Sequence, residues 1–275
     1  MVKVLGHMLK QSNTIKGIKV GNREHRIVQY ADDTTVCVRD IESIKETLMI
    51  FDRFGTCSGL KLNYKKTKGI WLANLKDHGI RVCNNIVFTG KPIKCLGVYI
   101  GHDYAQCKIF NWDKRIDRIE TCINQWKKRK ISLPGKVYVI KTYLLSKIVY
   151  PSTVLAIPND IVIRLKKLLF EYLWGKRDRI KRSTIIKRLE EGGLNMIDLD
   201  NFIISLKCSW VTKINTIDGK WSEILLHYIS KTGLTLDYVM KMNVKCIDEL
   251  PILNVIPQFY RDIFLVWISI GNPNS

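Results

Sequence analysis

The residues with the clearest chemistry are two adjacent aspartates, Asp32 and Asp33. Neighbouring carboxylates repel each other unless a cation binds them, and hard oxygen ligands suit Mg²⁺, which completes its coordination with water and phosphate. In a two-metal site, one ion activates the attacking oxygen and the other stabilises the leaving oxygen. The alternative is that this acidic pair only makes a soluble turn, and the pair alone does not exclude that.

The flanking residues predict a β-hairpin that presents the acidic pair. Two β-prone runs, residues 26–30 and 34–38, enclose the aspartates, and aspartate is poor in strands but common in turns. Residues 15–20 alternate apolar and polar side chains, which predicts a further strand before a turn at Gly21-Asn22. Both carboxylates are therefore expected at the tip of a hairpin.

A helix is expected after this hairpin, because Asp40 is a good N-cap and apolar residues follow at spacings of three and four. The expected buried stripe consists of Ile41, Ile44, Leu48, Phe51 and Phe54. Gly55 and Gly59 are expected to end the helix.

Two further strand pairs are predicted downstream. Residues 60–63 and 69–72 are expected as short strands joined by a basic turn, and residues 86–88 and 95–100 as a hairpin around Gly90-Lys91-Pro92. Residues 15–110 therefore have the pattern of a mixed α+β unit.

The charge distribution indicates an anionic partner. The formal net charge is +20, and residues 114–188 alone carry 20 basic and five acidic side chains. A protein that follows a phosphate backbone shows such a stretch, whereas solvated lysine-rich helix faces are the alternative. Three helices are predicted here, over residues 113–131, 137–149 and 160–174. Pro134-Gly135 is expected to separate the first two, and Pro151 and Pro158 to bracket a loop.

Cysteine usage and hydropathy limit the compartment. The eight cysteines form no CxxC pair and no zinc-binding spacing, so we expect free thiols without a disulfide partner. The first residues contain no long apolar run, and the uncharged stretch Val149–Asn159 has only 11 residues and two prolines. We therefore expect a protein that is not secreted, has no membrane partner and is nuclear or cytoplasmic.

Several segments resemble a known family. Tyr30-Ala31-Asp32-Asp33-Thr34 resembles the metal-binding motif of reverse transcriptases. The segments that follow resemble those of LINE-type (non-LTR) retrotransposon polymerases, in the same order. Ser58–Asn63 with Lys66-Thr67 resembles the next palm motif, and Leu96-Gly97-Val98 resembles the primer-grip hairpin. Lys130–Lys136 resembles the start of the thumb, and Phe170–Trp174 with Glu191–Leu194 resembles the segments after the thumb. The resemblance covers residues 15–199.

This resemblance implies roles for particular residues. Asp32 and Asp33 would hold catalytic Mg²⁺, and Lys66 would act on the leaving pyrophosphate, unless it is merely one lysine of a solvated turn. Leu96 and Gly97 would steer the primer 3′ end, unless they belong to an ordinary core hairpin. The partners would be an RNA template and a DNA primer, with dNTP as the substrate. Their phosphates would be contacted by Lys127, Lys128, Arg129, Lys130 and Lys136. Cys95 stands where the family has a bulkier residue.

The resemblance also implies a domain plan with an α+β fold. Residues 1–111 would form a partial palm with the primer grip, residues 112–188 a basic helical thumb, and residues 189–275 a helical extension. The family's fingers and its earlier palm strand, which carries another metal-binding aspartate, have no counterpart here, so we expect no activity from this chain alone. The alternatives are an inactive nucleic-acid-binding remnant, or a degenerate frame without a stable product, against which the intact hydrophobic periodicity argues.

Overall fold

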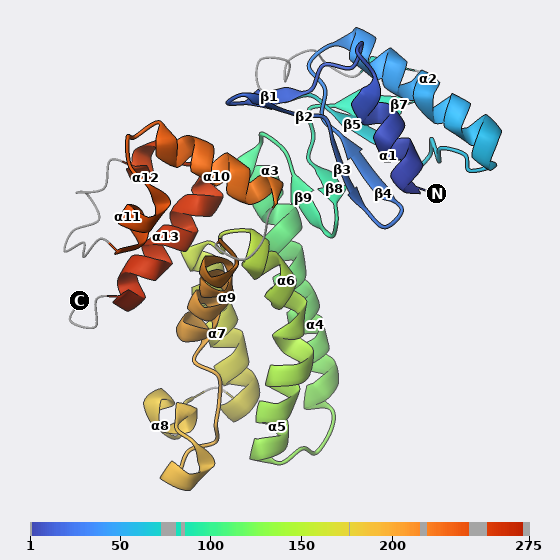
Figure 1. Ribbon diagram of the computed structural model, residues 1–275. Coiled ribbons are helices and arrows are strands. Elements are labelled where there is room, and N and C mark those ends of the chain that lie inside the picture. Colours follow the sequence, from blue (N-terminus) through green and yellow to red (C-terminus); the bar gives the residue numbers. More distant parts are fainter. Residues whose placement is uncertain are drawn as a thin grey trace. The chain divides into compact units, whose positions relative to one another are not determined.

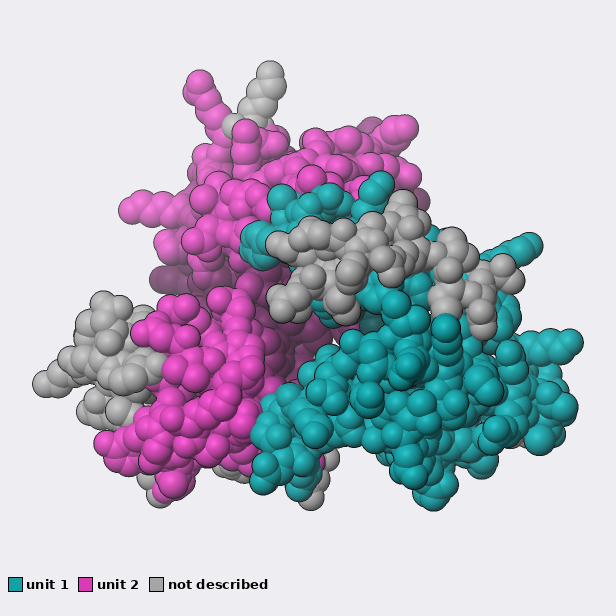
Figure 2. Space-filling view, turned by 90° about the horizontal axis from the view of Figure 1, so that it is seen from above, with its two compact units in different colours: residues 1–107 teal, residues 108–275 magenta. Residues whose placement is uncertain are grey.

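The computed structural model describes residues 2–72, 81–83, 86–175, 177–214, 219–241 and 252–271. The chain forms two compact units, residues 1–107 and residues 108–275 (Figure 2). The first unit combines helices with short strand pairs, and the described part of the second is helical, which confirms the predicted α+β class (Figure 1). The assignment of the segments to a palm, a thumb and an extension stays a prediction.

The first unit contains two long helices and nine short strands among its described residues. In chain order, its elements are α1 (Val2–Gln11), β1 (Ile18–Val20), β2 (Arg23–His25), β3 (Ile27–Tyr30), β4 (Asp33–Val36), α2 (Ile41–Ser58), β5 (Lys68–Ile70), β6 (Arg81–Cys83), β7 (Ile86–Thr89), β8 (Ile93–Cys95), β9 (Val98–Ile100) and α3 (Tyr104–Lys108), which ends in the second unit. The pairs β1–β2, β3–β4, β6–β7 and β8–β9 are antiparallel, and β5 pairs with β7 in parallel.

Helix α2 positions the predicted hairpin. The Oδ1 of Asp40 accepts a hydrogen bond from the Ser43 N–H at 2.8 Å, which confirms the predicted N-cap. One side of α2 packs against α1 and β3, through a cluster made of Leu5, Leu9, Ile15, Ile27, Ile50 and Phe54. Its other side packs against the β5–β7 region, through Ile44, Leu48, Trp71 and Ile86. Because Ile27 belongs to β3, the hairpin strand is fixed by its own buried side chain.

The details of α2 differ from the predicted pattern at two places. Ile41 is exposed, because it lies in the first turn beyond the packed faces. Gly55 lies inside the helix and only Gly59 ends it, with φ of 74° in the left-handed region. A side chain at Gly55 would come within 2.8 Å of the Leu60 carbonyl oxygen, so this glycine allows the chain to turn back closely after the helix.

The predicted strand over residues 60–63 is wrong. The Asn63 carbonyl accepts hydrogen bonds from the N–H groups of Lys66 and Thr67, so this segment forms local turns instead of a ladder. The predicted hairpin of residues 86–88 and 95–100 is also wrong, because β7 pairs with β5 and β6 while β9 pairs with β8. The local closure of β8 onto β9 needs only two turn residues, and short loops cost less entropy.

The described part of the second unit is built from helices with two π-helical turns. Its further elements are a π turn (Ile109–Asp113), α4 (Lys114–Lys127), α5 (Leu133–Val139), a π turn (Ile140–Leu144), α6 (Ser146–Val154), α7 (Asn159–Trp174), α8 (Arg182–Ile186), a 3₁₀ turn (Leu189–Glu191), α9 (Leu199–Ile214), α10 (Lys220–Ser230), α11 (Leu236–Lys241), α12 (Ile252–Val255) and α13 (Gln258–Gly271).

The predicted helices of this unit are present, with shifted ends. The helix that corresponds to residues 137–149 begins at Leu133, because the Ser132 Oγ caps it and Pro134 is tolerated in a first turn. Pro151 lies inside α6, so the loop that it was expected to open starts only at Leu155. Helix α7 matches its predicted range closely.

Two apolar cores hold the second unit together. The larger one joins α4 to α7 and includes fully buried Ile116, Ile119, Ile140 and Leu165. The smaller one joins α9 to α13, and α9 reaches both. Among the described residues, no helix is long and apolar enough to cross a bilayer, and the described cysteine side chains are free thiols.

Candidate functional site

The acidic pair lies at the turn between β3 and β4. Tyr30 pairs with Asp33, so Ala31 and Asp32 are the two turn residues and Asp33 begins β4. The hairpin prediction is confirmed, although only Asp32 is at its tip. Ala31 has a φ of 52°, which costs about 1–2 kcal/mol for a residue with a side chain. Strain of this kind gathers at functional turns.

Both carboxylates are open to solvent. Asp32 and Asp33 are exposed, and neither carboxylate makes a hydrogen bond or an ion pair with any residue that the structure describes. Their charge is therefore not neutralised by the described protein, and oxygen ligands of this kind fit Mg²⁺. The described ranges contain no group of three or more His, Cys, Asp or Glu side chains that could hold a metal ion. That Asp32 and Asp33 hold magnesium stays a prediction.

A second hairpin adjoins the acidic hairpin. The Thr35 Oγ1 lies 3.6 Å from the Cys95 Sγ, which links β4 to β8. Leu96 and Gly97 follow directly as the two turn residues between β8 and β9. The structure thus brings the candidate primer-steering residues to a hairpin next to the strand that begins with Asp33, and their role stays a prediction.

The Leu96-Gly97 turn allows a direct test of backbone strain. Both residues have positive φ, 44° and 86°, which is the pattern of a type I′ turn that favours Asn-Gly. Leu96→Asn is therefore expected to raise the free energy of unfolding by about 1 kcal/mol. Urea unfolding measures this, with Gly97→Ala as the opposite change that lowers stability. A lower midpoint for Leu96→Asn would show that the leucine contact outweighs the strain.

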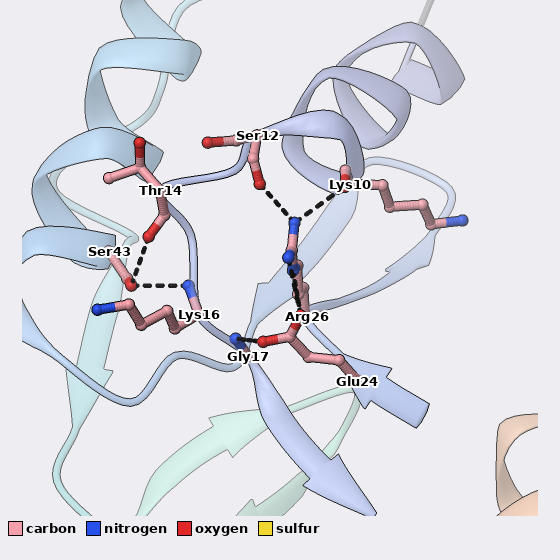
Figure 3. A network of polar contacts seen from close by, with 8 residues as sticks. All are labelled: Lys10, Ser12, Thr14, Lys16, Gly17, Glu24, Arg26 and Ser43. Carbon is pink, nitrogen blue, oxygen red and sulfur yellow. Dashed lines mark hydrogen bonds and ion pairs between the residues drawn. The ribbon is translucent and has the colours of Figure 1, made fainter. Parts of the chain in front are cut away.

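A polar network anchors the base of the acidic hairpin (Figure 3). The Arg26 guanidinium donates to the Glu24 carboxylate at 2.7 and 3.0 Å, and to the carbonyls of Lys10 and Ser12 at 2.9 and 2.6 Å. The Glu24 Oε1 in turn accepts from the Gly17 N–H at 2.7 Å. These hydrogen bonds hold the pKa of Glu24 below its ordinary value. The network ties the end of α1 to the residue that precedes β3.

Lys66 lies in the turn after α2 rather than beside the aspartates. Its side chain is exposed, and its N–H donates to the Asn63 carbonyl at 3.0 Å. No hydrogen bond or ion pair joins Lys66 to Asp32 or Asp33 within the described ranges. The structure therefore does not bring it into contact with the acidic pair, and its role toward pyrophosphate stays a prediction.

The basic cluster lies at the end of α4, in the second unit. Lys127, Lys128, Arg129 and Lys130 are all exposed, at the end of the helix and in the connection to α5. Lys136 differs, because its Nζ donates to the Leu173 carbonyl at 3.1 Å and so holds α5 to the end of α7. Four of the five predicted phosphate-binding cations thus gather on one exposed loop, and Lys136 has a partner of its own.

Aromatic residues beside this cluster were not predicted as site residues. The Arg129 guanidinium lies 4.5 Å from the Trp126 ring centre, and the Trp126 ring lies 5.3 Å from that of Tyr143. Tyr138 and Tyr143 are largely exposed. In the sequence, the tyrosines alternate with the short polar residues Thr142 and Ser146, and this pattern could have indicated an exposed aromatic surface.

Comparison with known proteins gives a distant relationship. No protein-family model matches the chain. The chain is 20% identical over 266 residues, 94% of its own length, to the uncharacterized 149 kDa protein of transposon TX1 from Xenopus laevis, and it spans 20% of that protein. It is 26% identical over 87 residues, 30% of its length, to a putative ribonuclease H protein from Arabidopsis thaliana, 14% of which is covered. The chain is therefore distantly related, along nearly its whole length, to a part of a transposon protein.

Proposed function

We propose that this chain is the palm and thumb portion of a reverse transcriptase of a LINE-type retrotransposon. The proposal rests on one observation above all: two adjacent, exposed and unneutralised carboxylates lie at a tight hairpin turn whose first strand is anchored in the hydrophobic core. The relationship to a transposon protein supports it, as does the exposed basic cluster on α4.

The proposed reaction is RNA-directed nucleotidyl transfer from a dNTP to a primer 3′-OH. Asp32 and Asp33 would hold Mg²⁺, which supplies activation of the attacking hydroxyl and stabilisation of the leaving pyrophosphate when bound. Leu96 and Gly97 would orient the primer end, and Lys127 to Lys130 would bind the phosphates of the template–primer. A complete two-metal site requires a further ligand, which the described residues do not provide near this pair.

Iron-directed cleavage tests the proposed metal site. Ferrous iron that occupies a magnesium site reacts with added hydrogen peroxide, with ascorbate as the reductant that regenerates it, and the hydroxyl radicals that form cut the nearby polypeptide. With template–primer and dNTP present, we expect cleavage close to residues 31–34, which excess Mg²⁺ suppresses and the double variant Asp32→Asn/Asp33→Asn abolishes. The matched control is Glu190→Gln/Glu191→Gln, an exposed adjacent acidic pair elsewhere in the chain. Cleavage that persists in the aspartate variant, or that occurs only elsewhere, contradicts the proposal.

A nucleic-acid-binding module without catalysis is the second candidate. It is favoured by the lack of a group of three metal-binding side chains in the described part of the chain. A primer-extension assay separates the two: the second candidate predicts tight template–primer binding but no Mg²⁺-dependent extension, and extension lost in Asp32→Ala would exclude it.

A further inference from the structure

Tyrosines line the exposed side of the helical run from α5 through the π turn to α6. Tyr138 is 67% exposed, Tyr143 53% and Tyr150 47%. The opposite side of the same run is buried, with Ile140 and Ile148 fully covered. The run is thus already anchored by its apolar side, and the core does not need the tyrosine rings.

Two short polar side chains of this run bond to backbone carbonyls of the run itself. The Thr142 Oγ1 donates to the Tyr138 carbonyl at 2.8 Å, and the Ser146 Oγ donates to the Tyr143 carbonyl at 3.0 Å. Both short side chains therefore turn back onto their own helix.

An aromatic contact joins the tyrosines to the basic cluster at the end of α4. The Trp126 ring contacts the Tyr143 ring in a T-shaped arrangement, with 5.3 Å between the ring centres and 61° between the planes, and the Arg129 guanidinium lies 4.5 Å from the Trp126 ring centre. Lys127 and Lys128 are exposed next to it in sequence. Helix α4 lies against the π turn and α6 (Figure 1). Trp126 therefore places Arg129 close to Tyr143.

We propose that this surface, the tyrosine row formed by Tyr138, Tyr143, Trp126 and Arg129, binds unpaired bases of a single-stranded nucleic acid. Exposed aromatic rings stack on base faces of any sequence, and interleaved cations bind the backbone. In a duplex these faces are covered by neighbouring bases, so the rings select single strands while the lysines serve either form. The inference rests on the proposed nucleic-acid binding of the second unit and adds a base-stacking site to it.

An abasic probe tests stacking separately from charge. The affinity of the full chain for a labelled 12-nucleotide oligothymidylate is compared, by fluorescence anisotropy, with that for a 12-mer that has the same phosphates but no bases. We expect the wild type to prefer the base-bearing strand about tenfold or more. Tyr138→Ala/Tyr143→Ala should bind both probes equally, with an unchanged salt dependence, whereas Tyr143→Phe should retain the preference.

The control is Tyr238→Ala, which removes a comparably exposed tyrosine from α11 in the same unit. If the wild type binds both probes equally, or if the double variant keeps its preference, the tyrosine row does not stack bases. Binding of a template–primer duplex is measured in the same assay. Because duplex binding depends on the cations, it tests the proposed function separately from base stacking. Loss of binding to every nucleic acid would instead contradict the proposed function itself.

Discussion

A variant in which Lys127, Lys128, Arg129 and Lys130 are all alanine is expected to bind a template–primer duplex about a thousandfold more weakly near 0.1 M salt. Each neutralised phosphate releases counterions, and this lowers the slope of log affinity against log salt by about 0.9 per contact. Four exposed cations on one connection between helices should therefore account for about 3–4 units of the slope. Anisotropy titrations at several salt concentrations measure both quantities.

The control keeps the same net charge but changes another surface. Alanine at Lys10, Lys19, Lys45 and Arg53 removes three lysines and one arginine from exposed positions of the first unit. If both variants lose the same affinity and slope, net charge alone attracts the nucleic acid and the cluster on α4 has no special part. If only the α4 variant loses affinity, the cluster is the binding surface. Thermal unfolding of both variants checks that they fold.

The features that depend on local sequence were predictable. The hairpin around the acidic pair, the Asp40 cap and the helix over residues 160–174 follow from propensity and period, and the structure has all three. The turn that replaces the expected strand at residues 60–63 was not predictable, because its formation depends on which carbonyls the N–H groups after Gly59 can reach. The pairing of β7 with β5 likewise depends on contacts between distant segments.

Side-chain contacts that depend on tertiary packing could not be predicted from the sequence. Lys207 is only 4% exposed, with its Nζ 3.4 Å from the Thr153 carbonyl oxygen and 5.4 Å from the Phe259 ring centre, and burial lowers its pKa. Nothing in the pattern of α9 marks this lysine, because its burial comes from α6 and α13, which pack against α9. The anchoring of Lys136 on Leu173 has the same origin.

Arg26→Ala is expected to lower the stability of the first unit by about 2–3 kcal/mol, since hydrogen bonds that involve a charged group contribute about 1.5–3 kcal/mol each and partly compensate one another. The substitution removes the Arg26 donor from the Glu24 Oε2 and from the carbonyls of Lys10 and Ser12. The Arg26 and Glu24 side chains are about one-fifth exposed, so water replaces these bonds only in part. Hydrogen exchange of residues 2–17 should rise most, because this segment is what the guanidinium holds.

The same substitution should change the pH dependence of stability. Glu24 has a pKa below its ordinary 4.5 in the folded protein, first because Arg26 donates to it and then because Gly17 does. A carboxyl with a lowered folded pKa contributes stability above its unfolded pKa, and this contribution is lost as the pH falls through that value to the folded pKa.

The wild type should therefore lose stability below about pH 4.5, and Arg26→Ala should lose less over the same range, because its Glu24 pKa lies nearer to the unfolded value. Arg26→Lys is the matched variant: it keeps the charge but not the planar fork, so its stability and acid sensitivity should fall between the other two. Equal acid sensitivity of all three proteins would show that Glu24 gains nothing from Arg26. An unchanged exchange rate in residues 2–17 would show that the network does not hold α1 onto the acidic hairpin.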